Sequence, residues 1–359
     1  MSKYNLSEIL RVYGIDPDVC SITEFKQGHI NDSFILDVDS NCRFFLQRIN
    51  HHVFKDPESL MDNLVRVEGA LLKHYGSYDK MPYPAVKKNQ NKKYFHLDKQ
   101  GNFWRMMEYV PDCRSYNIAE DAGIAREGAA AFGKFQQVMM GETVLDYVPT
   151  IPDFHHLGKR LLQLQSAIEK DEYDRVGKAR KEITFALDRL DYAETLGDLI
   201  REKIIPLRVT HNDTKLNNVL FNNKGKYICV VDLDTVMPGT VLYDYGDMVR
   251  TFTSPVEEDE PDTVKVILRE EIFEALTRGY LSELKDVLQQ GEKEHLLFGA
   301  KVMLLMIGVR FLTDYLEGDH YFKVGRDKHN LDRCQNQFAL LRQLEKNESR
   351  FRDIIKACL

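Results

Sequence analysis

Residues 211–218 read His211-Asn212-Asp213-Thr214-Lys215-Leu216-Asn217-Asn218, and this polar stretch lies between short apolar runs at 208–210 and 219–221. Runs of β-branched and aromatic residues on both sides predict two strands with a loop between them. The loop carries a carboxylate and a carboxamide in the spacing H-x-D-x-x-x-x-N. These groups suit a base and an oxygen ligand for a hard cation.

A second polar signal follows one hairpin later. Residues 222–225, Asn-Asn-Lys-Gly, predict a turn that joins 219–221 to the apolar run 227–231. Asp232 comes directly after that run. An aspartate at the end of a buried strand projects its carboxylate beyond the edge of the sheet, so Asp232 is a second candidate metal ligand.

The two motifs together have the composition of a phosphoryl-transfer site. Such a site needs a carboxylate that orients the attacking hydroxyl and oxygen ligands for Mg²⁺ on the phosphates. We therefore expect Asp213 to be the catalytic base, and Asn218 and Asp232 to bind Mg²⁺. His211 is expected to brace the loop, and Lys215 to neutralise phosphate charge.

Short strands dominate the first third of the chain. Asp56 is a good N-cap, Pro57 suits the first helical position, and Gly76 can end the helix between them. The patterns predict strands at 21–26, 33–37, 43–49, 93–97 and 103–110, and a helix over 57–75.

From about residue 120 the sequence becomes helical. Apolar periodicity predicts helices at 124–140, 157–169, 175–190 and 192–204, and again from about 265 to the end. Strands followed by helices indicate an α+β protein. We expect a small N-terminal antiparallel β-sheet lobe with one helix (1–111) and a larger, mainly helical C-terminal lobe (112–359).

Composition excludes several classes of function. The formal net charge of -7 disfavours binding to nucleic acid or to anionic membranes, both of which require a basic surface. The six cysteines contain no C-x-x-C pair, which argues against a zinc site. They lie far apart in a long chain, so a disulfide framework is not expected, and we expect a reducing, cytoplasmic location. The apolar stretch 302–309 is far too short for a membrane span. The sequence does not define an oligomeric state, and we expect a monomer.

The motifs resemble those of the aminoglycoside phosphotransferase and choline kinase superfamily. Its usual pattern is H-G-D-x-x-x-x-N followed by an apolar strand and an aspartate, so Asn212 departs from the common glycine. The chain resembles the bacterial N-acetylhexosamine 1-kinases most closely. That resemblance rests on the stretches 47–54, 60–63, 104–109, 211–218 and 232–239.

The resemblance implies a bilobal, protein-kinase-like fold that binds ATP and Mg²⁺. Gly28 and Asn31 lie where a nucleotide-covering loop belongs, and Glu108 and Val110 where a hinge binds adenine. Gln47 and Arg48 compete for the inward position of the third strand, because neighbouring strand residues face opposite sides. We choose Arg48, since phosphate requires a cation.

The acidic partner of that cation is expected on the helix over 57–75. Glu68 borders the apolar stripe of this helix, whereas Glu58 and Asp62 point away from it. We therefore expect Glu68 to bind nucleotide through the basic residue, with an exposed i,i+4 contact as the alternative.

The resemblance also implies an acceptor site for a small-molecule sugar. His29, Arg310 and Tyr321 are its candidates. Arg310 interrupts an apolar helical face and therefore needs either a ligand or a neighbouring carboxylate. Asp234 could bind a hydroxyl or a second metal, or support its loop, and we include it in the substrate site. Asp244 and Asp247 are expected to brace the activation-loop region.

Three hypotheses follow. The first is phosphorylation of the anomeric hydroxyl of N-acetylglucosamine or N-acetylgalactosamine. The second keeps the chemistry but changes the acceptor to an aminoglycoside, choline, homoserine or another sugar; the acidic run 257–262 could serve a cationic acceptor. The third is an inactive kinase-like module, which the presence of Asp213, Asn218 and Asp232 disfavours.

Overall fold

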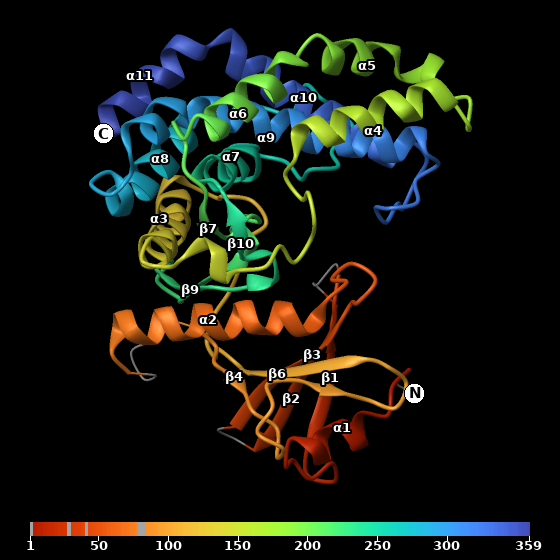
Figure 1. The fold of residues 1–359 in the computed structure, drawn as a ribbon, viewed down its shortest axis with the longest axis vertical. Helices are drawn as coiled ribbons and strands as arrows, with labels where there is room; N and C mark the ends of the chain where they lie inside the picture. The colour runs from red at the N-terminus through yellow and green to blue at the C-terminus, as the bar shows by residue number, and fades with distance from the viewer. Residues whose placement is uncertain (1–2, 27–29, 40–41, 78–82) are drawn as a thin grey trace. The chain divides into compact units, whose positions relative to one another are not determined.

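The computed structural model describes residues 3–26, 30–39, 42–77 and 83–359. Its elements form two compact units (Figure 1). The first unit comprises Met1–Cys113, Asp146–Pro152 and Val231–Met237, and the second unit comprises the remaining residues. The fold is α+β, with an antiparallel sheet in the N-terminal part and mostly helices in the C-terminal part, as predicted.

An antiparallel sheet forms the centre of the first unit. Its strands follow the order β1-β2-β3-β6-β4, and β5 also pairs with β6. Register places Gln47 opposite Arg105, and Arg48 opposite Trp104. The strands are β1 (Ser21–Phe25), β2 (Asp32–Asp39), β3 (Cys42–Ile49), β4 (Val86–Lys87), β5 (His96–Leu97) and β6 (Phe103–Glu108).

A short helix, α1 (Leu6–Val12), covers one face of this sheet. Its apolar side chains pack in one cluster with Leu36, Leu46 and Trp104. The sequence-based prediction of a single helix in this lobe was therefore wrong. A helix of seven residues is too short to show a clear 3.6-residue periodicity, and packing stabilises it instead.

The long helix of the first unit, α2 (Pro57–Tyr75), begins and ends as predicted. Asp56 accepts a hydrogen bond from the Ser59 backbone N–H at 3.1 Å, and Gly76 ends the helix with a φ of 81°. α2 runs along the sheet (Figure 1). Asn63 fastens two loops to this helix, because its Nδ2 donates to the carbonyl oxygens of Val148 (2.8 Å) and Val236 (3.0 Å).

The second unit is built around α9, which packs against α4, α7 and α10. α9 is long and apolar enough to cross a membrane, but 83% of its most apolar window is buried inside the protein. It is therefore a core helix. The helices are α3 (Ala122–Met139), α4 (Leu157–Lys170), α5 (Arg180–Leu187), α6 (Asp191–Arg201), α7 (Val241–Phe252), α8 (Glu270–Leu284), α9 (Gln290–Leu316), α10 (His329–Lys346) and α11 (Glu348–Cys358).

Short strands interrupt the helices where the polar motif lies. β7 (Arg208–Thr210) precedes residues 211–218, which we call the catalytic loop, and β8 (Val219–Phe221) follows them. β8 forms a hairpin with β9 (Tyr227–Val230), and β10 (Met237–Gly239) pairs with β7. The predicted hairpin between the two motifs is therefore present.

Two glycines allow α7 and α9 to cross closely beside this loop. A Cβ on Gly246 would lie 2.5 Å from the Gly299 carbonyl oxygen, and a Cβ on Gly299 would lie 2.7 Å from that of Leu242. Neither contact is compatible with a larger residue unless the helices move apart. The crossing fixes α7 beside the catalytic loop.

Candidate active site

Asp244 on α7 holds the start of the catalytic loop. Its carboxylate accepts hydrogen bonds from the backbone N–H groups of His211 (3.0 Å) and Asn212 (2.7 Å). Thr214 Oγ1 donates to the backbone oxygen of Asp244 at 2.6 Å. Burial raises the pKa of Asp244 to about 7, although the two N–H groups favour its charged form. Asp244 therefore braces the catalytic loop itself.

His211 lies inside the loop and is fully buried. Its ring packs edge-on against Phe132 and Phe135 of α3, with ring centroids 5.2 and 5.7 Å away. Its Nδ1 accepts a hydrogen bond from the Asp213 backbone N–H at 3.2 Å. The side chain thus orients the peptide of the neighbouring aspartate and has no direct access to solvent.

Asn212 adopts the left-handed conformation, with a φ of 65°. Glycine adopts this region without strain and asparagine tolerates it, so the conformation explains why either residue can stand here. The Asn212 amide bonds to Thr210, and a Cβ on Gly239 would lie 2.5 Å from Asn212 Oδ1. The asparagine side chain therefore occupies space that Gly239 leaves open.

Asp213, Lys215 and Asn218 form a compact polar group in the second unit. Asn218 Nδ2 donates to the backbone oxygen (2.9 Å) and to Oδ2 (3.0 Å) of Asp213. Lys215 Nζ lies 3.0 Å from Asp213 Oδ1. Because the Asn218 nitrogen makes both bonds, its amide oxygen is the atom that could bind a cation.

The charge of Asp213 is set by its neighbours. Burial alone would raise the pKa of this carboxyl, but the Lys215 ammonium and His211 outweigh burial and hold the pKa below its ordinary value. The Asp213 carboxylate in turn raises the pKa of Lys215. Asp213 is therefore a carboxylate at neutral pH, the form that accepts a proton.

Replacing Lys215 with methionine is expected to move the acid limb of the kcat/KM profile to higher pH. The reason is that loss of the ammonium removes the charge that stabilises the Asp213 carboxylate, so the pKa of Asp213 rises. The measurement is a pH–rate profile of both proteins. An acid limb at the same pH in both would contradict this account of the pKa.

Asp232 belongs to the first unit and lies at the start of a short 3-10 turn, Leu233–Thr235. Its φ of 61° is again left-handed. Its carboxylate offers oxygen ligands, the kind that a hard cation such as Mg²⁺ prefers. Among the described residues, no group of three or more His, Cys, Asp or Glu side chains is arranged to hold a metal ion.

A buried ion pair that the sequence patterns did not predict links β6 to the Asp232 segment. Arg105 Nη1 and Nη2 lie 2.5 and 3.0 Å from the two carboxylate oxygens of Asp234, and both side chains are only 2% exposed. Burial would lower the pKa of Arg105, but Asp234 outweighs burial and raises it. Arg105 stands opposite Gln47 and also donates to its Oε1, a pairing that depends on the register of β3 and β6 and that the sequence does not supply.

This pair changes the interpretation of Asp234 and Asn31. Asn31 Nδ2 donates to Asp234 Oδ2 at 2.8 Å, and Asn31 Oδ1 accepts from the Asn50 N–H at 2.9 Å. The Asp234 carboxylate is thus engaged by Arg105 and Asn31 rather than open to a hydroxyl or a second metal. Of the alternatives for Asp234, support of its loop fits this geometry.

The predicted pair of Arg48 and Glu68 is not formed. Arg48 lies on the α1-facing side of β3, where it pairs with Asp32 at 2.6 Å and stacks on Tyr4. Glu68 accepts a hydrogen bond from the Val86 backbone N–H at 3.2 Å. Strand alternation puts Gln47, not Arg48, on the Arg105 face of the sheet, and the role of Arg48 at phosphate stays a prediction.

The remaining nucleotide-site candidates are only partly described. Glu108 ends β6 and pairs with Lys87 at 3.0 Å, while the Val110 carbonyl oxygen accepts from Cys113 Sγ at 3.1 Å. Gly28 and His29 lie outside the described residues. Their predicted roles in covering the nucleotide and binding the acceptor stay predictions.

Arg310 on α9 has no carboxylate within ion-pair distance among the residues that the structure describes. Its guanidinium instead lies near the rings of Phe154, Tyr321 and Phe322, at 5.2, 5.7 and 5.5 Å from their centroids. Burial lowers the pKa of Arg310, while Tyr321 and, to a smaller extent, the charge of Asp213 act in the opposite direction. Aromatic rings thus surround the Arg310 guanidinium in place of the salt bridge that the sequence analysis considered.

The acidic run 257–262, in contrast, is already compensated. Each of its first four carboxylates has a partner: Glu257 with Asn117, Glu258 with Arg250, Asp259 with His329, and Glu260 with Lys265. Arg250 also pairs with the buried Asp247 at 2.8 Å. The run is therefore fixed to the helical unit by its own charges, which weakens the case for it as a site for cationic acceptors.

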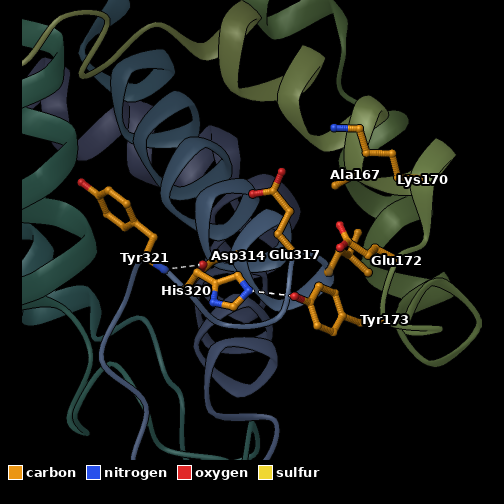
Figure 2. Close-up of a pocket in the computed structure, with 9 residues that line it drawn as sticks. Ala167, Lys170, Glu172, Tyr173, Asp314, Glu317, His320 and Tyr321 are labelled. Carbon is orange, nitrogen blue, oxygen red and sulfur yellow. Dashed lines mark hydrogen bonds between the residues drawn. The ribbon is translucent and has the colours of Figure 1, made fainter.

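A cavity of about 380 Å³ opens beside the end of α9 (Figure 2). Its lining includes Tyr173, His320 and the buried Asp314, but no residue of the catalytic loop. Asp314 is saturated by Asn330 and by the backbone N–H groups of Tyr321 and Phe322. Figure 2 shows the Tyr321 ring directed away from the other lining residues. The cavity is therefore separate from the catalytic loop.

A kinase-like α+β fold with a buried aspartate loop and a strand-end aspartate defines a small-molecule phosphotransferase. The chain belongs to the phosphotransferase enzyme family APH, whose model matches residues 21–286.

Solved structures show the same fold along nearly the whole chain. One is the amicoumacin kinase hAmiN in complex with AMP-PNP, Ca²⁺ and Ami, with a TM-score of 0.63, 13% identity and coverage of 95% of this chain and 94% of that one. A second is the microcompartment-associated aminopropanol kinase, with a TM-score of 0.59, 16% identity and coverage of 97% of this chain and 98% of that one. A third is choline kinase from Cryptosporidium parvum Iowa II, with a TM-score of 0.58, 14% identity and coverage of 96% of each chain.

Proposed function

We propose that this protein is an ATP- and Mg²⁺-dependent kinase that phosphorylates the anomeric hydroxyl of an N-acetylhexosamine to give the sugar 1-phosphate. The observation that carries the phosphotransferase part is the group of Asp213, Lys215 and Asn218 on the catalytic loop. Related folds have been solved with AMP-PNP or ADP, which supports nucleotide binding. In this proposal residues 1–111 bind nucleotide, and residues 112–359 carry the catalytic loop and the substrate site.

The reaction needs little covalent chemistry from the protein. Asp213 would orient the acceptor hydroxyl and take its proton as the oxygen attacks the γ-phosphorus and ADP leaves. Lys215, beside Asp213, would offset negative charge on the transferred group. Asn218 and Asp232 would hold Mg²⁺, which neutralises phosphate charge when bound. His211 and Asp244 keep the loop in place.

The charges around Asp213 favour a neutral, oxygen-rich acceptor over a cationic one. Arg310 has aromatic neighbours and no carboxylate partner among the described residues, so its N–H donors suit hydroxyl or amide oxygens of a ligand. A quaternary ammonium or an aminoglycoside would instead meet a like charge there. Arg310 therefore favours an acetamido sugar over cationic acceptors such as choline or aminopropanol.

Arg310→Ala is expected to lower kcat/KM for the acceptor by about 10–100-fold, because a hydrogen bond from a charged group contributes about 1.5–3 kcal/mol. The KM for ATP should stay unchanged. Steady-state kinetics with each substrate varied measures this, and Arg180→Ala, at an exposed arginine of the same unit, is the matched control. Equal losses in both variants would remove Arg310 from the acceptor site.

The acceptor class is tested by ADP release over N-acetylglucosamine, N-acetylgalactosamine, glucose, galactose, choline, homoserine and kanamycin. We expect the acetamido sugars to give the highest kcat/KM, because a site that binds the amide rejects analogues that lack it. Turnover restricted to choline or kanamycin would keep the phosphotransferase assignment and refute the sugar. Nucleotide binding without turnover on any acceptor would favour an inactive module.

A further inference from the structure

A second histidine, far from the catalytic loop in sequence, also contacts that loop. His155 lies in the segment before α4 and is only 7% exposed. Its Nε2 lies 2.8 Å from the carbonyl oxygen of Asn212. A carbonyl oxygen only accepts hydrogen bonds, so Nε2 must carry the proton and donate it. We propose that His155 is a positioning residue that fixes the Asn212–Asp213 peptide through this bond, a role that rests on the proposed function of Asp213.

The bond acts at the peptide where the loop is most constrained. The Asn212 carbonyl belongs to the same planar peptide unit as the Asp213 N–H, which donates to His211 Nδ1. Asp244 holds the Asn212 N–H on the other side of the left-handed residue. With His155 on the carbonyl, this peptide cannot rotate without breaking bonds, and the Asp213 side chain keeps its direction.

The His155 ring is itself firmly held. It packs against the rings of Phe154 and Tyr243, with centroids 4.3 and 5.1 Å away. Its Nδ1 is buried and has no hydrogen-bond partner among the described residues. Burial lowers the pKa of His155 to about 3, with Arg310, Asp213 and Arg160 as the charged groups that act on it. The ring therefore stays neutral, and the donating tautomer is kept throughout the neutral range.

The same segment reaches the acceptor side. Phe154, next in sequence, lies against the Arg310 guanidinium. Arg160 of α4 fixes the segment, because its Nη2 donates to the backbone oxygens of Asp153 (3.2 Å) and Phe154 (3.3 Å). One short segment thus contacts the candidate acceptor arginine with one side chain and the catalytic loop with the next. This segment therefore sets the position of Asp213 relative to the bound acceptor.

The test compares His155→Leu with His155→Gln. Glutamine places an amide N–H near the position of Nε2, whereas leucine fills space without a donor. We expect the leucine variant to lose about 10–100-fold in kcat, since a small misplacement of a catalytic group has an effect of this size. KM values for ATP and acceptor should change less than about twofold, and glutamine should restore most of the activity. His156→Gln, at the exposed neighbouring histidine, is the control.

Hydrogen exchange of the loop supplies a readout that does not depend on turnover. His155→Leu should speed exchange at the backbone amides of 212–214, and His155→Gln should not. If the leucine variant does not fold, His155→Phe keeps the ring packing without the donor and takes its place. Unchanged kcat and unchanged exchange in the variant without a donor would overturn the proposal. An inactive wild-type protein would refute the proposed function alone, because the exchange comparison still decides the role of His155.

Discussion

Asp213→Asn is expected to lower kcat by about 10²–10⁴-fold, the usual contribution of a positioned general base. The amide has nearly the shape of the carboxylate, so the Lys215 and Asn218 side chains can stay in place while the proton acceptor is lost. The KM for ATP should change little, because Asp213 is proposed to contact the acceptor hydroxyl. Coupled ADP release under saturating substrates measures the effect.

Asp188→Asn is the matched control for this change. Asp188 is an exposed residue at the end of α5 in the same unit, so its replacement should leave kcat and thermal unfolding unchanged. Near-normal turnover of Asp213→Asn, with a folded protein by circular dichroism, would show that proton transfer does not depend on this carboxylate. The site would then need another base.

Asp234→Ala is expected to destabilise the protein by about 3–5 kcal/mol, because it leaves the Arg105 guanidinium buried without its counter-ion. Asp234 also anchors Asn31, so the change removes the side-chain bonds that join the Asp232 segment to Asn31, just before β2, and to Arg105 of β6. Activity should fall with stability, since Asp232 lies two residues away. Chemical denaturation followed by circular dichroism measures the loss.

The comparison that isolates the buried charge uses two further variants. Lys99→Ala breaks an exposed pair with Glu8 in the same unit and should cost less than about 1 kcal/mol. Arg105→Met combined with Asp234→Leu removes both charges and should recover part of the loss of the single variant. If Asp234→Ala unfolds at the same denaturant concentration as the wild type, the ion pair contributes nothing to stability.

The sequence predicted the elements that carry strong local signals. Asp56, Pro57 and Gly76 define the ends of α2, and the hairpin between the two polar motifs follows from its Asn-Asn-Lys-Gly turn. α1 was missed because seven residues give little periodicity, and its stability comes from packing on the sheet. Periodicity also predicted one helix over 175–190. The structure instead has a 3-10 turn at Val176–Ala179, followed by α5.

The candidate site shows the same division between local and long-range information. The spacing from His211 to Asn218 is local, and the structure brings Asp213, Lys215 and Asn218 together. Which of Gln47 and Arg48 faces Asp234 depends on the absolute register of β3, and alternation alone cannot supply it. The contact of His155 with Asn212 joins segments that only the tertiary fold brings together.

The most direct test of the proposed reaction is the structure of its product. The protein is incubated with ATP, Mg²⁺ and N-acetylglucosamine, and the phosphorylated sugar is examined by ³¹P NMR with coupling to the sugar protons. We expect one phosphate ester coupled to the anomeric proton, and no ester in the Asp213→Asn reaction. A phosphate on any other hydroxyl, or no sugar phosphate while another acceptor is phosphorylated, would contradict the proposed function.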